Sequence, residues 1–239
     1  MKCLRVRYTK RGKIRFIGHR DVARIWERTL RKANIPVLYS QGFSPHPRIS
    51  FGLALPTGFE SEAEYVDIYL GAEFFTEGFD AILIQQEIDR ALPTGMNALA
   101  VGIVSTSEDS LQEAVDSCVW EVRVSGVCVE EFKKIRNDLF SSESLNIERE
   151  RKGKLLVEDV RFQVHSMDIA EEHADGVTIL TELGTKPRVL RPTDLLKRIN
   201  SELRTVRVLR KEQLTLQGNH RIEPLSVELN PAAPAEVLA

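Results

Sequence analysis

Residues 3–33, CLRVRYTKRGKIRFIGHRDVARIWERTLRKA, change their hydrophobic period part-way along and thereby indicate the fold. Within Cys3–Tyr8, arginines alternate with apolar side chains, as expected of a strand with one buried face. Further along, the apolar residues recur at helical spacing, so we expect an amphipathic helix over Arg20–Ala33. The chain therefore opens with a strand followed by a helix.

The same analysis predicts a complete structural unit in the first half of the chain. Further strands are expected at Val37–Ser40, Arg48–Leu55, Glu64–Leu70 and Ala98–Val104, and a second helix at Thr76–Leu92. With the first return strand broken by a loop, the order is β-α-β-β-α-β, which is the ferredoxin-like unit. In such a unit two helices cover one face of an antiparallel sheet, and the other face stays open.

The pattern repeats in the second half. Strands are expected at Val119–Val127, Leu145–Arg151, Lys154–Glu158, Arg161–Ile169, Val177–Leu183 and Val206–Leu216, and helices at Glu130–Phe140 and Pro192–Leu203. We therefore predict an α+β protein made of two tandem ferredoxin-like domains, the second with an extra hairpin. The expected boundaries are 1–106 and 118–218 for the domains, 107–117 for a linker and 219–239 for a C-terminal tail.

Charge divides the first half of the chain into two blocks. Residues 1–50 contain thirteen Lys or Arg against two acids, whereas residues 51–117 contain one Arg against thirteen acids. The formal net charge of −2 hides this change of sign, and residues 118–239 are nearly balanced with nineteen basic and twenty acidic residues. Two oppositely charged surfaces are therefore expected on the first domain, and a dense basic surface commonly faces phosphate.

Composition favours an ordinary globular protein. With 239 residues, of which 42% are hydrophobic, the chain can bury two cores. Met1–Tyr8 alternates charged and apolar residues, and no run approaches the roughly 20 apolar residues of a membrane span. We therefore expect a cytoplasmic protein without a membrane segment. The three cysteines are odd in number and far apart, which predicts reduced thiols rather than disulfides or a metal site.

Alternation along the strands predicts a group of arginines and tyrosines on the open sheet face. Arg5 and Arg7 point away from the core, and Arg48, Tyr65 and Tyr69 join them if the apolar residues between them are buried. Guanidinium and phenol groups hold phosphates and stack bases, as on the sheet face of a common RNA-binding module. Further positive charge is expected from the loop residues Lys10, Arg11, Lys13 and Arg15 and from the helix residues Arg20 and Arg24.

Other interpretations of this basic surface stay open. It can be a docking face for another protein, or the second domain can pack on the sheet and cover it. The basic helix can also be neutralised by an acidic neighbour that spans Glu77–Asp89. Nucleic-acid binding is the interpretation carried forward here.

A Gly/Pro loop lies between two expected strands and reads Ser40-Gln41-Gly42-Phe43-Ser44-Pro45-His46-Pro47. Proline fixes φ and glycine permits unusual φ, so we expect a rigid loop that presents Phe43, Ser44 and His46. The loop lacks the spacing of a phosphate-binding P-loop, and Ser44 beside His46 has no third member for nucleophilic catalysis. Ordering of the turn is one interpretation. The other is an acid–base pair of His46 with His19 for metal-free RNA cleavage.

A resemblance to a known family is carried by Phe16–Asp21, the basic helix to Ala33, Pro36–Pro47, Gly58 and Glu64–Asp67, and in the second half by the turn Arg191-Pro192-Thr193. Together they resemble a bacterial radical SAM-linked family of unknown function, whose members occur beside, or fused to the C-terminal side of, a radical S-adenosylmethionine protein. The resemblance extends over nearly the whole chain and implies a radical SAM partner in RNA maturation or ribosome-related modification. The chain has no C-x-x-x-C-x-x-C motif, which a radical SAM iron–sulfur site needs. We therefore expect the iron–sulfur cluster and S-adenosylmethionine to be bound by the partner, and we expect no cofactor in this chain.

Three functions follow from these observations. The first is a non-catalytic accessory module that binds tRNA-like or rRNA-like RNA through its basic surface while the acidic block engages the radical SAM partner. The second is a ribonuclease-like or RNA-modifying enzyme that uses His19 and His46, and the third is a scaffold that binds only protein. The separation of the two histidines distinguishes the first two, because both must reach one phosphate at roughly 3 Å.

Overall fold

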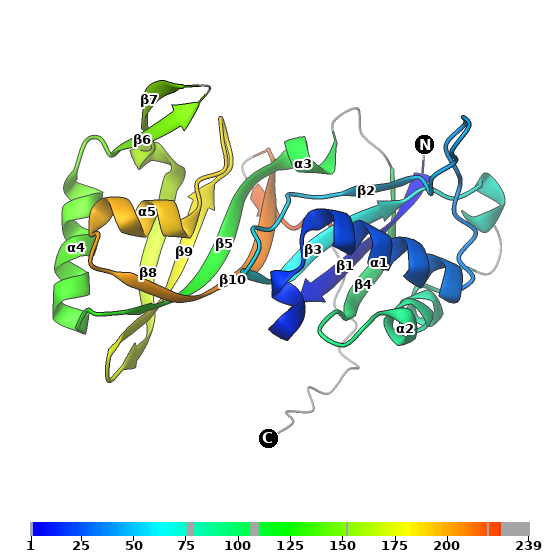
Figure 1. Ribbon diagram of the computed structural model, residues 1–239, viewed down its shortest axis with the longest axis horizontal. Coiled ribbons are helices and arrows are strands. Elements are labelled where there is room, and N and C mark those ends of the chain that lie inside the picture. Colours follow the sequence, from blue (N-terminus) through cyan, green and yellow to red (C-terminus); the bar gives the residue numbers. More distant parts are fainter. Residues whose placement is uncertain (1, 76–78, 106–109, 152, 219, 226–239) are drawn as a thin grey trace.

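A large mixed sheet dominates the computed structural model, which describes residues 2–75, 79–105, 110–151, 153–218 and 220–225 (Figure 1). Neighbouring strands follow the order β4-β1-β3-β10-β5-β9-β8, with β2 paired to β3 and β11 paired to β10. Helices pack on this sheet in both halves of the chain, so the predicted α+β class is confirmed.

The first half of the chain supplies the strands β4, β1, β3 and β2 in that spatial order. Its elements are β1 (Lys2–Lys10), α1 (His19–Lys32), β2 (Ile49–Phe51), β3 (Glu60–Ile68), α2 (Ala81–Ala91) and β4 (Ala98–Ser105). β1 is central and antiparallel to both neighbours, with Val6 opposite Val66 on one side and Val101 on the other. The prediction that Cys3–Tyr8 and Glu64–Leu70 share one antiparallel sheet is confirmed over the residues that pair.

The helices of the first half bury one stripe each against this sheet. In α1 the stripe contains Val22, Trp26 and Leu30, which join the core side chains of β1 and β3. The helix ends before Asn34, whose positive φ of 54° turns the chain away. α2 begins later than predicted because the Asp80 carboxylate caps it, accepting hydrogen bonds from two backbone amides of the first turn.

The second half supplies β10, β5, β9 and β8 in that spatial order. Its elements are β5 (Val115–Ser125), α4 (Val129–Ser141), β6 (Asn146–Arg151), β7 (Lys154–Asp159), β8 (Val164–His173), β9 (Gly176–Gly184), α5 (Pro192–Ile199) and β10 (Arg204–Gln217). β6 and β7 pair only with each other, as the hairpin inserted before β8. Pro192 stands in the first turn of α5, where its missing N–H costs nothing.

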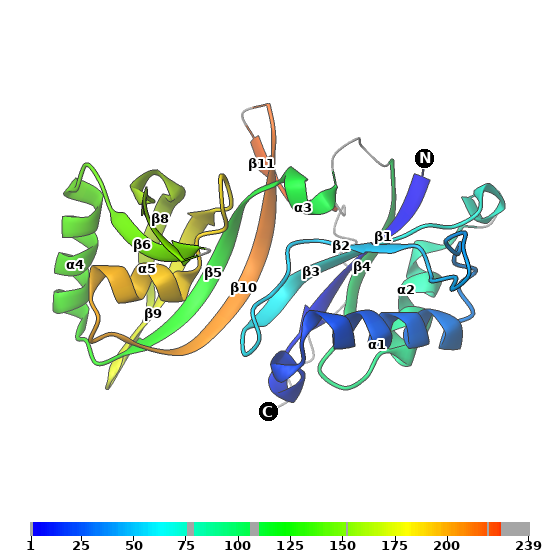
Figure 2. The same cartoon turned by 45° about the horizontal axis from the view of Figure 1, so that its top comes forward.

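The two halves meet along a seam where β3 runs parallel to β10, with Leu209 opposite Glu60 and Arg210 opposite Ser61. The segment after β2 strengthens this seam, because its Leu53 belongs to the core of the second half. The ring of Phe59 meets the ring of Trp120 edge-on at 6.0 Å. One sheet therefore runs through both halves (Figure 2).

Several boundaries differ from the predictions. Within the expected linker, Ser110 caps α3 (Leu111–Ala114) through a reciprocal hydrogen-bonded box with Glu113, and β5 follows without a gap. Within the expected tail, β11 (His220–Ile222) pairs with β10, and Leu225 is buried. The expected strand Val37–Ser40 contributes only isolated bridges.

Among the described residues there are also three short 3-10 helices: η1 (Gly12–Phe16), η2 (Ala72–Phe75) and η3 (Arg161–Gln163). Part of the predicted Thr76–Leu92 helix, residues 76–78, lies outside the described residues, as do residues 106–109 of the expected linker region and residues 226–239. In the part of the chain that the structure describes, none of the helices has the length and apolar character needed to cross a membrane.

Candidate nucleic-acid interface

The motif loop, residues 40–47, is closed by its own backbone and stands out from the end of the first half. The Ser40 amide donates to the His46 carbonyl at 2.8 Å, and the His46 amide donates to the Ser40 hydroxyl oxygen at 3.0 Å. Gly42 adopts a φ of +143°, a value that side-chain-bearing residues rarely take. The tip residue Phe43 has an exposed fraction of 109%, so its ring makes no packing contact.

A cation–aromatic platform lies at the base of the motif loop. The guanidinium of Arg48 lies 5.0 Å from the centre of the Tyr69 ring, and Arg48 itself is exposed. The Tyr69 amide donates to the Arg48 carbonyl at 3.0 Å, which ties the loop to the end of β3. Tyr39, half exposed, stands on the other side of the loop. The structure therefore leaves Arg48 exposed and Tyr69 partly exposed at the base of the loop.

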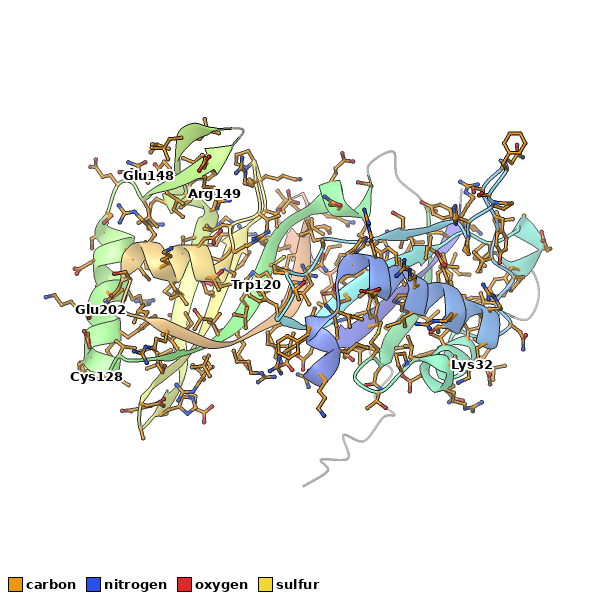
Figure 3. All side chains as sticks on the ribbon, viewed as in Figure 1. Lys32, Trp120, Cys128, Glu148, Arg149 and Glu202 are labelled. Carbon is orange, nitrogen blue, oxygen red and sulfur yellow. The ribbon has the colours of Figure 1, made fainter. Side chains whose placement is uncertain are left out.

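The exposed face of α1 carries the second part of this surface. Its cations are Arg20, Arg24, Arg28, Arg31 and Lys32, all exposed. Among the described residues, only Arg24 has a carboxylate partner, the exposed Asp21 at 3.2 Å. Such surface pairs are worth about 0–1 kcal/mol and are readily exchanged for a phosphate. Figure 3 shows Lys32 at the end of α1 far from the seam, where Trp120 is labelled.

The predicted sheet-face site is not available in this structure. Arg5 forms a bidentate pair with Asp67, at 2.7 and 2.8 Å, and also donates to the carbonyl of Pro224 at 2.7 Å. Arg7 pairs with Glu223 at 2.6 Å, and Tyr65 is only 1% exposed. The physical reason is the C-terminal segment, residues 220–225. Its first part is β11, which pairs with β10, and its last three residues pack over this face.

The four cations predicted for the loop after β1 divide between surface and interior, and the first of them, Lys10, is the last residue of β1. Lys13 is exposed, as predicted, and Arg15 is partly exposed beside Phe16, 4.6 Å from its ring centre. Lys10 is buried instead, and its ammonium donates to the carbonyls of Arg15 and Ile17. Burial lowers the pKa of Lys10. Arg11 pairs with Glu62 of β3.

The two candidate catalytic histidines stand on different parts of the first half. His19 begins α1, and its ring meets the ring of Phe51 edge-on at 5.1 Å. His46 lies in the motif loop, which follows the C-terminal end of α1, whereas His19 stands at its start. Figures 1 and 2 show this loop beyond the C-terminal end of α1, whereas His19 is at the N-terminal end. The structure therefore does not bring the pair together around one phosphate.

Sequence reasoning missed the ion pairs that cross the seam. Glu64 pairs with the fully buried Arg210, whose guanidinium also donates to the Leu53 carbonyl at 2.8 Å. Glu60 accepts from Arg207 at 2.6 Å and from the Gly12 amide at 2.8 Å. The available signal was the alternation of acids at positions 60, 62 and 64, but their partners lie about 150 residues away.

A small cavity borders this seam on the helix-covered side of the sheet. Its volume is about 20 Å³, and it is lined among others by Tyr8, Lys10, His19 and Glu64. This volume holds about one water molecule. The cavity is too small for a nucleotide or a cofactor.

The cysteines lie apart from one another and from any cluster of metal-ligating side chains in the described part of the chain. No group of three or more His, Cys, Asp or Glu side chains there is arranged to hold a metal ion. Burial raises the pKa of Cys3 to about 12 and that of Cys118 to about 11, so both stay protonated thiols. All three cysteines are free thiols, as predicted, and Cys128 is exposed just before α4, which begins at Val129.

Comparison with known proteins gives a family. Residues 3–192 match the family described as "Uncharacterized protein conserved in bacteria (DUF2344)". The chain belongs to this family. No curated protein matches the sequence. A solved structure titled "Crystal Structure of a Cbf5-Nop10-Gar1 Complex" has a chain with 9% sequence identity and a TM-score of 0.48. The match covers 88% of this chain and 48% of the other chain. This chain therefore spans about half the length of the chain it matches.

Proposed function

We propose that the chain is an RNA-binding accessory protein that holds RNA through the outer face of α1 and the motif loop. One observation carries this proposal: the exposed cations of α1, of which only Arg24 has a carboxylate partner among the described residues, and the exposed rings of the motif loop come from neighbouring stretches of sequence with few acids. Between Glu27 and Glu60 the sequence contains no acidic residue, and this stretch includes the end of α1 and the whole motif loop. A surface of this kind attracts a polyanion.

The arrangement of cations on α1 supports binding to phosphates. Arg20, Arg24 and Arg28 are spaced four residues apart, so they form one row along the helix with a rise of about 6 Å between neighbours. Arginine is suited to phosphate because its planar guanidinium offers paired N–H donors. The proposed contact thus keeps the helix residues Arg20 and Arg24 and the loop-base residue Arg48 of the predicted surface, and leaves out Arg5, Arg7 and Tyr65 of the sheet face.

We also propose that each half is a ferredoxin-like unit. The strand orders β4-β1-β3-β2 and β10-β5-β9-β8, each with two helices between strands, support this interpretation. The continuous sheet then results from two such units joined edge to edge through β3 and β10.

A radical SAM protein is the proposed partner, and the support for it is the sequence resemblance. In this proposal the partner carries the iron–sulfur cluster and S-adenosylmethionine, and the present chain presents the RNA. The acidic block is a weaker candidate for the contact than the sequence alone indicated. Glu60, Glu62, Glu64 and Asp67 are already paired with basic side chains of this chain.

Charge reversal on α1 tests the proposed function. We expect the triple variant R20E/R24E/R28E to bind a labelled single-stranded RNA more than about 30-fold more weakly at moderate salt, because three phosphate contacts become repulsive. The log–log salt slope should become shallower by about 2, at about 0.7 per lost contact. Fluorescence anisotropy at several salt concentrations measures both quantities.

A matched control lies on the second half. The triple variant K133E/K134E/K197E removes three exposed lysines and makes the same change in net charge. We expect it to retain most of the affinity, since these residues lie on α4 and α5. Equal losses of RNA affinity in the two triple variants would show nonspecific electrostatic attraction. An anisotropy signal of the unmodified chain that does not depend on salt would contradict RNA binding and would favour a protein-docking role for the basic face.

A further inference from the structure

The ring of Phe43 is the least protected apolar group among the described residues, with an exposed fraction of 109%. The loop that carries it is held in shape by the bonds between Ser40 and His46 and by two prolines. A Phe side chain that stays in water forgoes the favourable free energy of burial. A closed loop that displays such a ring therefore presents it to a ligand.

We infer that the ligand offers an unpaired nucleobase, which stacks on Phe43. This inference rests on the proposed function, and it specifies which kind of RNA the site takes. Single-strand-binding surfaces combine a positively charged track with aromatic rings that stack successive bases. The exposed row of arginines on α1 is the charged track, and Phe43 with the Arg48–Tyr69 platform supplies the rings.

The charge around the loop favours a nucleobase over an apolar protein pocket. Along the loop segment the exposed Arg48 lies five residues from Phe43, and the nearest acids in the sequence are Glu27 and Glu60, while on the Tyr69 side the nearest exposed acid in the sequence is Glu73 of η2. A protein partner would have to supply both an apolar pocket and an acidic rim. A nucleotide supplies both properties in one unit, a flat ring and an adjoining phosphate.

The geometry of RNA explains why the base must be unpaired. In an A-form duplex the base faces are covered by their neighbours, and the deep major groove excludes side chains. Only bases in single strands, loops, bulges or ends can separate and accept an aromatic ring. We therefore expect duplex RNA to contact the cations of α1 without engaging Phe43.

Replacement of Phe43 by tryptophan turns this inference into a spectroscopic test. The native tryptophans, Trp26 and Trp120, are 0% and 2% exposed, so a tryptophan at position 43 is the solvent-exposed reporter. F43W is titrated with a single-stranded RNA and with the same strand in a duplex. We expect fluorescence quenching by the single strand and none by the duplex, even where anisotropy shows that the duplex binds.

Affinity provides an independent measurement. F43A should weaken single-strand binding by about tenfold and leave duplex binding unchanged, because one stacked base is lost. F162A is the matched control, since Phe162 is 61% exposed on η3 in the second half. We expect F162A to bind like the unmodified chain.

The outcomes separate this inference from the proposed function. If both RNAs bind with a steep salt dependence but F43A leaves the affinity unchanged and F43W is not quenched, the inference that an unpaired base stacks on Phe43 is overturned. The proposed RNA-binding function then stands. If neither RNA binds the unmodified chain, the proposed function itself is overturned. Quenching of F43W by the single strand together with the tenfold loss in F43A supports the inference.

Discussion

The arginines of β1 and those of α1 belong to one basic stretch of sequence but have different roles in the structure. Arg5 and Arg7 have side chains that are 14% and 21% exposed, and both are tied to carboxylates. Arg24 on α1 is 71% exposed. Density of charge in a sequence therefore does not give the charge on a surface. The topology decides which cations stay free.

The position of each element explains the difference. β1 lies between β4 and β3, so its backbone is paired on both edges and its side chains must find partners above and below the sheet. Asp67 of the neighbouring strand and Glu223 of the C-terminal segment supply them. α1 lies in the outer layer with one face toward solvent, and the described structure contains no ion pair that joins it to α2. The alternative in which an acidic helix over Glu77–Asp89 neutralises α1 is therefore not supported by any ion pair in the described residues, and Glu77 itself lies outside them.

The buried Arg210 gives the largest effect in this comparison. R210A should lower the free energy of unfolding by about 3–5 kcal/mol, because it leaves the carboxylate of Glu64 buried without its partner. R24A, which removes an exposed arginine, should change it by less than about 0.5 kcal/mol. Urea unfolding followed by circular dichroism measures both variants. Similar stabilities of the two would contradict the division into structural and exposed arginines.

Arg5 should give an intermediate effect. R5A should lower the free energy of unfolding by about 2 kcal/mol. The reason is that the carboxylate of Asp67, only 7% exposed in the structure, loses its bidentate partner and the carbonyl of Pro224 loses a donor. RNA affinity should stay within about twofold of that of the unmodified chain, measured by anisotropy well below the melting temperature. K2A, at the exposed start of the same strand, is the control for stability. A large loss of RNA affinity in folded R5A would show that the sheet face takes part in RNA binding.

Glu60 gives the smallest effect and a pH signature. Burial acts to raise the pKa of Glu60, but hydrogen bonds from Arg207 and the Gly12 amide outweigh it, so the pKa is lowered. The stabilisation is therefore fully present above the unfolded pKa of about 4.3 and is lost as pH falls through the lower folded pKa. E60Q should cost about 1 kcal/mol near pH 7 and lose less stability than the unmodified chain on acidification.

The control for this titration is E87Q on α2, whose partner Arg90 is exposed. Its stability should follow the pH dependence of the unmodified chain. Parallel curves for E60Q and the unmodified chain between about pH 6 and pH 3 would show that Glu60 does not stabilise the seam through its charge.

Much of the fold was predictable because its signals are local. The change of period within residues 3–33 gives β1 and α1 without any knowledge of partners, and Pro192 marks the start of α5. The exposure of the motif loop also follows from its glycine and prolines. The start of α2 was missed because capping by Asp80 decided it rather than the apolar pattern.

The fate of the sheet face could not be predicted in the same way. The bond from Arg5 to the Pro224 carbonyl spans 219 residues, and the short segment that covers the face has no strong strand pattern of its own. Burial of Tyr65 follows from the same cover. Pairing of β3 with β10 depends on how two units meet at their edges, and hydrophobic period alone does not encode that contact.

The parallel seam between β3 and β10 fixes the distance across the molecule. The motif loop projects from one end of the continuous sheet, and the β6–β7 hairpin stands at the other (Figure 1). In the described residues the strand order is unbroken from β4 to β8. The two halves therefore share backbone hydrogen bonds along β3 and β10 as well as side-chain contacts such as that of Phe59 with Trp120, and do not depend on the connecting segment alone.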